Sequence, residues 1–137
     1  MTAYSFRVEI EGVQVPGVTE VTHLATEREV VAFREGTAEG DAADRLLPGR
    51  WKTGELTMTR PVSADDTFGA WLHESGPAGG LRRSGAVVLY DADGVVVRRY
   101  GFSGGWPKRL QIDGLDSGAD SVITETLTVV YEHLTTE

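Results

Sequence analysis

The stretch Ser121–Leu134, with the sequence SVITETLTVVYEHL, decides the fold class of this chain. Its apolar side chains alternate with threonines, which is the period of a β-strand with one buried face. The predicted strand has fourteen residues, more than twice the usual length of about 5–6. Such a strand needs a partner along most of its run, which favours a sheet that closes on itself or on a neighbour. The predicted buried face comprises Ile123, Leu127, Val129 and Tyr131, and the opposite face comprises Thr124, Thr126 and Thr128.

The composition is ordinary for a globular protein, since 40% of the 137 residues are hydrophobic and 25% are charged. The length fits one domain, so we predict a single domain over residues 1–137. The chain has no cysteine, which excludes disulfides and zinc–thiolate sites. Its apolar runs are far shorter than the roughly 20 residues that span a bilayer, and its N-terminal residues lack a signal-peptide pattern. We therefore expect synthesis in a reducing cytoplasm and no membrane binding by the subunit itself.

The net charge of −8 is spread evenly along the chain. Direct binding of nucleic acid needs a basic patch that displaces counterions from phosphates, so this charge disfavours it. The acidity indicates either solubility alone or a specific electrostatic role.

Shorter alternating segments predict about eight or nine strands in total. The clearest hairpin joins Ala86–Asp91 to Val95–Phe102 through Ala92-Asp93-Gly94, with glycine where a positive φ is needed. The sequence Gly104-Gly105-Trp106-Pro107 is expected to break the run before a short strand at Lys108–Ile112. The other predicted strands are Tyr4–Glu11, Val13–Val15, Val18–Leu24, Glu27–Arg34 and Lys52–Val62.

One helix is predicted at about residues 64–75. Ser63, with Asp66 three residues later, resembles a capping box. Phe68, Trp71 and Leu72 form one apolar stripe at helical spacing. A helix this short must dock that stripe on a sheet to be stable.

Residues 35–50 are predicted to form a long loop, because glycines, a proline and polar residues interrupt the strand pattern. Leu46-Leu47-Pro48 is unusual in a solvated loop, since two adjacent leucines need a surface to cover them. Two interpretations remain open: the loop folds back on its own core, or it contacts another subunit.

The sequence contains no persuasive catalytic, cofactor or metal site. His23, His73 and His133 are not spaced as metal ligands or as parts of a nucleophile motif. The aspartates of Asp113–Asp120 are typical of exposed turns, although they could hold a cation. Arg82-Arg83 is either a solvated pair or a contact to carboxylates across an interface.

The order of several weak motifs resembles one known family. FRVEIEG (6–12) is followed by REG (34–36), LPG (47–49), a helix with an internal tryptophan, RRSGAVVLYDADG (82–94), GWP (105–107), ETL (125–127) and YEHL (131–134). From Tyr4 to Leu134, the chain resembles the tail tube proteins of contractile-tailed phages, which also form the inner tube of phage-derived extracellular contractile injection systems.

This resemblance implies a small antiparallel β-barrel or sandwich with one flanking helix, similar to type VI secretion tube rings. It implies that six copies form a ring, that inner strands join into a β-lined channel, and that rings stack into a tube. A sheath would enclose the tube, baseplate and terminator proteins would close its ends, and protein cargo or phage DNA would occupy the lumen. The protein would be made in the bacterial cytoplasm and become part of a phage tail or a phage tail-like particle.

On this basis we predict a structural, non-enzymatic tube protomer without cofactors, with an acidic channel as a further hypothesis. The alternatives are a monomeric β-barrel that binds a small ligand in its interior and an enzyme built around Asp113–Asp120 or a histidine. The candidate lumen or interface face is Thr124, Thr126 and Thr128. The candidate intersubunit contacts are Arg34, Glu35, Leu46, Leu47, Pro48, Arg82 and Arg83.

Overall fold

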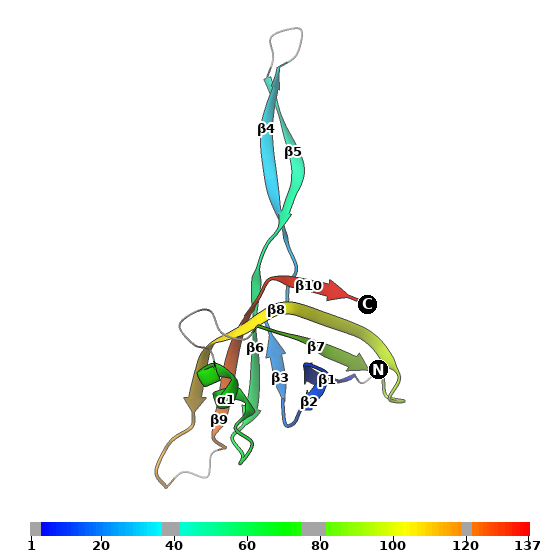
Figure 1. The fold of residues 1–137 in the computed structure, drawn as a ribbon. Helices are drawn as coiled ribbons and strands as arrows, with labels where there is room; N and C mark the ends of the chain where they lie inside the picture. Colours follow the sequence, from blue (N-terminus) through cyan, green and yellow to red (C-terminus); the bar gives the residue numbers. More distant parts are fainter. Residues whose placement is uncertain (1–3, 37–41, 75–81, 119–121) are drawn as a thin grey trace.

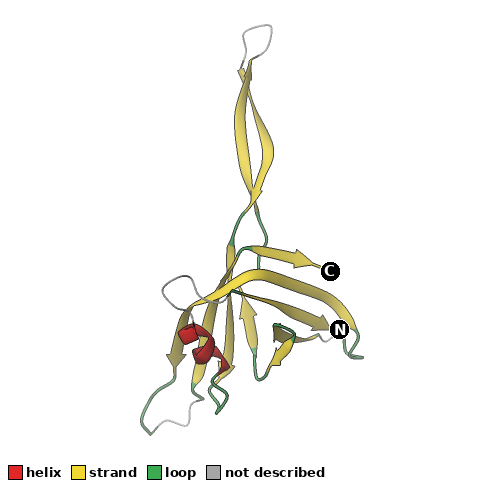
Figure 2. Ribbon diagram, in the orientation of Figure 1, coloured by secondary structure: helices red, strands yellow, loops and turns green. Residues whose placement is uncertain are grey.

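Strand β8, Val96–Asp113, is the longest element and joins the two halves of the fold. The computed structural model describes residues 4–36, 42–74, 82–118 and 122–137. Within these ranges there are ten strands and one helix, and the paired strands are antiparallel (Figure 1, Figure 2). Besides β8, the elements are β1 (Ser5–Ile10), β2 (Val13–Val15), β3 (Glu20–Thr22), β4 (Arg28–Gly36), β5 (Ala42–Trp51), β6 (Gly54–Pro61), α1 (Thr67–Glu74), β7 (Arg83–Tyr90), β9 (Thr124–Tyr131) and β10 (His133–Thr136).

The main sheet has the strand order β2-β1-β7-β8-β9-β6-β3, and β10 also pairs with β8. The first half of β8 pairs with β7 and β10, and its second half pairs with β9. Figure 1 shows that β8 curves along its length, so the two halves of the sheet lie at an angle. The mainly β, antiparallel fold with one short helix is therefore confirmed.

The prediction of one fourteen-residue final strand is wrong. That stretch is divided at Glu132 into β9 and β10, which pair with different halves of β8. The expected break at Gly104–Pro107 is also wrong, because β8 runs straight through it. Gly104 has a positive φ of 66°, and a β-bulge follows Pro107, so the residues that seemed to interrupt the strand instead let it bend.

The predicted loop at 35–50 is wrong for the residues that the structure describes. Residues 42–51 form β5, which pairs with β4 in a separate two-stranded ribbon that projects from the body (Figure 1). Pro48 is accommodated because it lies next to a register shift in this ribbon, where a missing N–H is tolerated. Residues 37–41 lie outside the described ranges.

The hydrophobic core lies between the two halves of the curved sheet, with α1 against it. Leu127, Val129 and Tyr131 are buried as predicted, but Ile123 is 37% exposed because β9 begins only at the next residue. The helix begins at Thr67 rather than near residue 64, and it buries Phe68 and Trp71. The other fully buried apolar side chains include Val8, Leu56, Met58 and Phe102.

The capping box predicted at Ser63 and Asp66 is replaced by a cap from Asp65. The backbone N–H of Thr67 donates to Asp65 Oδ1 at 2.9 Å, while Ser63 Oγ accepts from the N–H of Asp65 at 3.2 Å. The hydroxyl of Thr67 also donates to Asp65 Oδ1, and this bond together with the backbone bond holds the pKa of the Asp65 carboxyl below its usual 3.8.

Because its pKa is lower in the folded chain, Asp65 stabilises the fold above about pH 4, and that contribution is lost as the pH falls through the folded-state value. We expect Asp65→Asn to lower the free energy of unfolding at pH 7, with the difference from the unsubstituted chain shrinking toward pH 3. Urea unfolding at both pH values tests this. A difference that is as large at pH 3 as at pH 7 would show that the cap does not depend on the charge.

Candidate functional site: assembly surfaces

One face of the main sheet is lined by polar side chains arranged in rows across four strands, and three of these strands contribute hydroxyl groups. This polar face belongs to β3, β6, β9 and the second half of β8, and it lies opposite the core. Thr124, Thr126 and Thr128, the candidate lumen residues, all lie on it, partly or largely covered by their neighbours. Two complete rows cross the four strands: Thr22, Thr57, Thr128 and Arg109 in one, and Glu20, Thr59, Thr126 and Gln111 in the other.

Side-chain hydrogen bonds connect neighbouring strands of the polar face. Thr59 and Thr126 share a hydroxyl–hydroxyl bond of 3.1 Å, and Thr22 bonds Thr57 in the same way. Lys108 Nζ donates to Glu55 Oε2 at 2.8 Å, which links β8 to β6 across β9. This hydrogen bond and the Lys108 charge lower the pKa of the Glu55 carboxyl. The polar face can therefore lie against water, and hydrogen bonds connect its side chains across the strands.

The polar-faced part of the sheet has a free edge on each side. Within the described residues, β3 pairs only with β6, and β8 from Trp106 onward pairs only with β9. Unpaired strand edges carry backbone donors and acceptors that another strand can meet. These two edges are therefore sites where a second chain can extend the sheet.

The β4–β5 ribbon exposes apolar side chains on both of its faces. Val30 and Leu46, both 69% exposed, lie on one face, while Val31, Phe33 and Leu47 lie on the other. Among the described elements, the extensive contacts of β4 and β5 are with each other. A two-stranded ribbon without a core is marginally stable alone in water. This ribbon therefore needs a covering surface, and the described part of the body does not supply one.

The structure brings some of the predicted contact residues together and separates others. Leu46, Leu47 and Pro48 in β5 lie opposite Ala32, Val31 and Val30 of β4, and Arg34 and Glu35 lie in β4 of the same ribbon. Arg82 and Arg83 instead lie at the start of β7, on the body of the fold. There Arg82 pairs with Glu132 and Arg83 with Glu74, acids of their own chain.

A second apolar surface, missed in the sequence, lies at the end of the body opposite the ribbon (Figure 1). It is formed where β6, β8 and β9 meet their connecting loops, and the N–H of Val62 donates to the carbonyl of Ile123 at 2.8 Å within it. We call this surface the base patch. Its side chains are 37–73% exposed, namely Val62, Ile112, Leu115, Val122 and Ile123.

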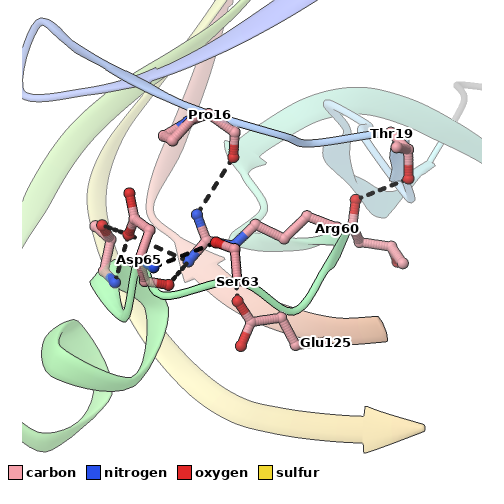
Figure 3. Close-up of polar contacts among 8 residues, drawn as sticks. Pro16, Thr19, Arg60, Ser63, Asp65 and Glu125 are labelled. Atoms are coloured by element: carbon pink, nitrogen blue, oxygen red, sulfur yellow. Dashed lines mark hydrogen bonds and ion pairs between the residues drawn. The ribbon is translucent and has the colours of Figure 1, made fainter. Parts of the chain in front are cut away.

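A buried ion pair, also missed in the sequence, joins the polar-faced strands to the helix. Arg60 is 1% exposed, and its Nε donates to Glu125 Oε1 at 2.7 Å. Its other nitrogens donate to the carbonyls of Pro16 at 3.3 Å and Asp65 at 3.0 Å (Figure 3). The Arg60 guanidinium also lies 4.0 Å from the centre of the Phe68 ring. The sequence did contain a signal for the burial of Glu125. Glu125 lies an even number of residues from the buried Leu127 and Val129, so the alternation of the strand places it on the same face.

The hollows that the structure describes lie at the surface rather than inside the barrel. One of them has a volume of about 260 Å³ and lies over Ala86 and Gly101, beside Glu9 and Arg99. The interior is filled by large side chains such as Trp71, Phe68 and Tyr131. The interior site expected of a small-ligand β-barrel is thus occupied by core packing. Among the described residues, no group of three or more acidic or histidine side chains could hold a metal ion, and no helix is long and apolar enough to cross a membrane.

Comparisons with solved structures find the same fold in contractile systems. The sheath–tube complex of the extracellular contractile injection system PVC in its extended state matches with a TM-score of 0.81 at 15% identity, over 96% of this chain and 87% of that chain. The tube-terminating cap of the anti-feeding prophage matches with a TM-score of 0.82 at 18% identity, over 96% and 87%. Hcp1 from Flavobacterium johnsoniae matches with a TM-score of 0.55 at 13% identity, over 96% and 93%.

At these identities, the solved structures establish the fold, and the sequence family establishes the kind of protein. No curated protein sequence matches the chain closely enough to count as a relative. The family described as T4-like virus tail tube protein gp19 matches residues 2–135, nearly the whole chain. The chain therefore belongs to the T4-like virus tail tube protein gp19 family and is a tail tube protomer.

Proposed function

We propose that this protein builds its tube by joining the polar-faced strands of neighbouring copies into one continuous wall, with the hydroxyl rows toward the lumen. The observation that carries this proposal is the polar face itself, which spans four strands, carries hydroxyl groups on β3, β6 and β9, and is backed by a hydrophobic core. A face of this kind is stable against water and has no need of a covering protein. It suits the inner wall of a water-filled channel.

Ring closure would join the free edge of β3 in one copy to the free edge of β8 in the next. The four strands alternate in direction, so β3 and β8 point in opposite directions and their union stays antiparallel. Six copies, the number that the family resemblance implies, would supply about 24 strands, which is more than barrels with an open aqueous channel require. Arg82 and Arg83 stay candidates for lateral contacts, although each already has an acidic partner in its own chain.

Ring stacking would place the β4–β5 ribbon of one copy against the base patch of a copy in the next ring. The two surfaces lie at opposite ends of the molecule (Figure 1), and both are apolar. Asp113 and Asp116 directly follow Ile112 and Leu115 of the base patch, while Arg34 and Arg45 lie on the ribbon. Because this contact joins two different surfaces of identical copies, it can repeat from ring to ring without the stack closing on itself, as a tube requires.

The protomer would act by assembly alone, with no catalytic step and no cofactor. A sheath would enclose the tube, baseplate and terminator proteins would bind its ends, and protein cargo or phage DNA would pass through it. On the polar face, the acids Glu20, Glu55 and Asp113 nearly balance the bases Lys108 and Arg109. The channel would therefore be close to neutral, and the chain's acidity would lie mostly elsewhere. Synthesis would take place in the bacterial cytoplasm.

Electron microscopy of the purified protein at rising concentration tests this function. Rings with a central channel, and rods of stacked rings, are the expected particles. Uniformly small particles at every concentration would contradict the proposal.

The orientation of the polar face can be tested with a single cysteine, because the chain has none of its own. In assembled tubes, Thr126→Cys is expected to react with a small maleimide but only slowly with one that carries a long polyethylene glycol chain, since the lumen admits the first more readily. In the monomer, both reagents should react at similar rates. Equal rates in the tube would place Thr126 on the outside.

A further inference from the structure

Two short links connect the β4–β5 ribbon to the body, and one side chain lies at both of them. The incoming link, residues 23–27, leaves β3, and the outgoing link, residues 52 and 53, leads to Gly54 at the start of β6. The hydroxyl of Tyr131 donates to the carbonyl of Ala25 and accepts from its N–H at 3.4 Å. A Cβ on Gly54 would lie only 2.6 Å from the same hydroxyl oxygen.

Tyr131 is well placed to act as a fixed point. It is 1% exposed, and its ring packs against Phe102 with 6.2 Å between ring centres. The two links are also tied to each other, since the N–H of Lys52 donates to the carbonyl of Glu27 at 2.8 Å. The links can therefore move as one unit, and Tyr131 joins that unit to the core by hydrogen bonds, beside the apolar contact that Leu24 of the incoming link makes with the core.

We propose that the Tyr131 hydroxyl is a latch that fixes the direction of the β4–β5 ribbon relative to the body. Tyr131 is thus a positioning residue for assembly, and this role rests on the stacking contact proposed above. With strands of nine and ten residues, the ribbon is about 30 Å long. A rotation of about 10° at its base would move its end by about 5 Å at that length, more than the diameter of a methyl group.

The role of the Tyr131 hydroxyl can be separated from the packing of the Tyr131 ring by a substitution that removes only the hydroxyl oxygen. Tyr131→Phe keeps the buried ring and deletes the hydroxyl, whereas Tyr100→Phe is a matched control. Tyr100 is a half-buried strand tyrosine whose hydroxyl has no hydrogen-bond partner within the described part of the chain. Spin labels on Ala32→Cys in the ribbon and Asp93→Cys in the β7–β8 turn would report the distance between ribbon and body, with no native cysteine to interfere.

In the unsubstituted background and in Tyr100→Phe, electron–electron resonance on the monomer should give one narrow distance distribution. In Tyr131→Phe, the distribution should broaden, and the concentration needed for tube assembly should rise by about 3- to 10-fold, the equivalent of one hydrogen bond. An unchanged distribution overturns the latch. If the distribution broadens but the concentration needed for tube assembly does not change, the role of the latch in stacking is overturned. If the unsubstituted chain forms no tubes, the proposed function fails, but the distance measurement still decides the latch.

Discussion

Replacing Arg60 by methionine is expected to lower the free energy of unfolding by about 3–5 kcal/mol, because the change leaves Glu125 as a buried carboxylate without its partner. The side chains of Arg60 and Glu125 are 1% and 8% exposed, so water cannot take over the lost interaction. The carbonyls of Pro16 and Asp65 would lose a donor at the same time. Urea denaturation of the monomer, followed by circular dichroism, measures the loss.

Two further variants show whether the stability depends on the pairing of Arg60 with Glu125 or on Arg60 itself. Arg60→Met combined with Glu125→Leu should recover most of the stability, since a buried ion pair replaced by apolar side chains of similar volume is often nearly neutral. Lys108→Met removes the partner of Glu55 at the surface, where both side chains are about half exposed, so a much smaller loss is expected. A single Arg60→Met variant as stable as the unsubstituted chain would contradict the structural importance of the buried pair.

Changing Leu46 and Leu47 together to serine is expected to abolish tube assembly while the monomer stays folded. These side chains are 69% and 47% exposed in the free chain, so they become buried only in an assembly. Losing the burial of two leucines removes about 3 kcal/mol from each contact, which weakens association by about 100-fold. Because the ribbon contributes little to the core, the unfolding free energy should change by no more than about 0.5 kcal/mol.

Sedimentation and electron microscopy over a concentration series would detect this loss of tubes. The matched control is Val96→Ser with Val97→Ser, which alters two neighbouring side chains that are 54% and 42% exposed on the body. The control should assemble as the unsubstituted chain does. Tubes that form at normal concentration from the leucine variant would rule out the ribbon as an essential contact.

Alternation of side chains was a sound guide to the faces of the sheet but a poor guide to where strands begin and end. The burial of Leu127, Val129 and Tyr131 could be predicted because β9 has a regular period of two. Its division from β10 at Glu132 could not, since the break depends on the curvature of β8, which pairs with both. The same curvature makes Gly104 part of a long strand instead of its end.

The ribbon and the buried ion pair were missed for a related physical reason. Composition suggested a loop at residues 35–50, because glycine, proline and acids are poor strand formers. Pairing with β4 overrode that preference. Glu125 was not included in the predicted buried face because it is charged, although its position in the alternation placed it with the apolar residues. Only the facing Arg60 on β6 makes a carboxylate acceptable there.

The even number of strands in the polar-faced sheet also bears on the size of the ring. Because each copy contributes four alternating strands, any number of copies can close with correct antiparallel pairing. A protomer with three alternating strands would instead meet its neighbour with a parallel pair at every junction, whatever the number of copies, because all copies in a ring point the same way. Strand direction therefore does not determine the number of copies in the ring. That number must depend on the angle between the β3 and β8 edges of one copy.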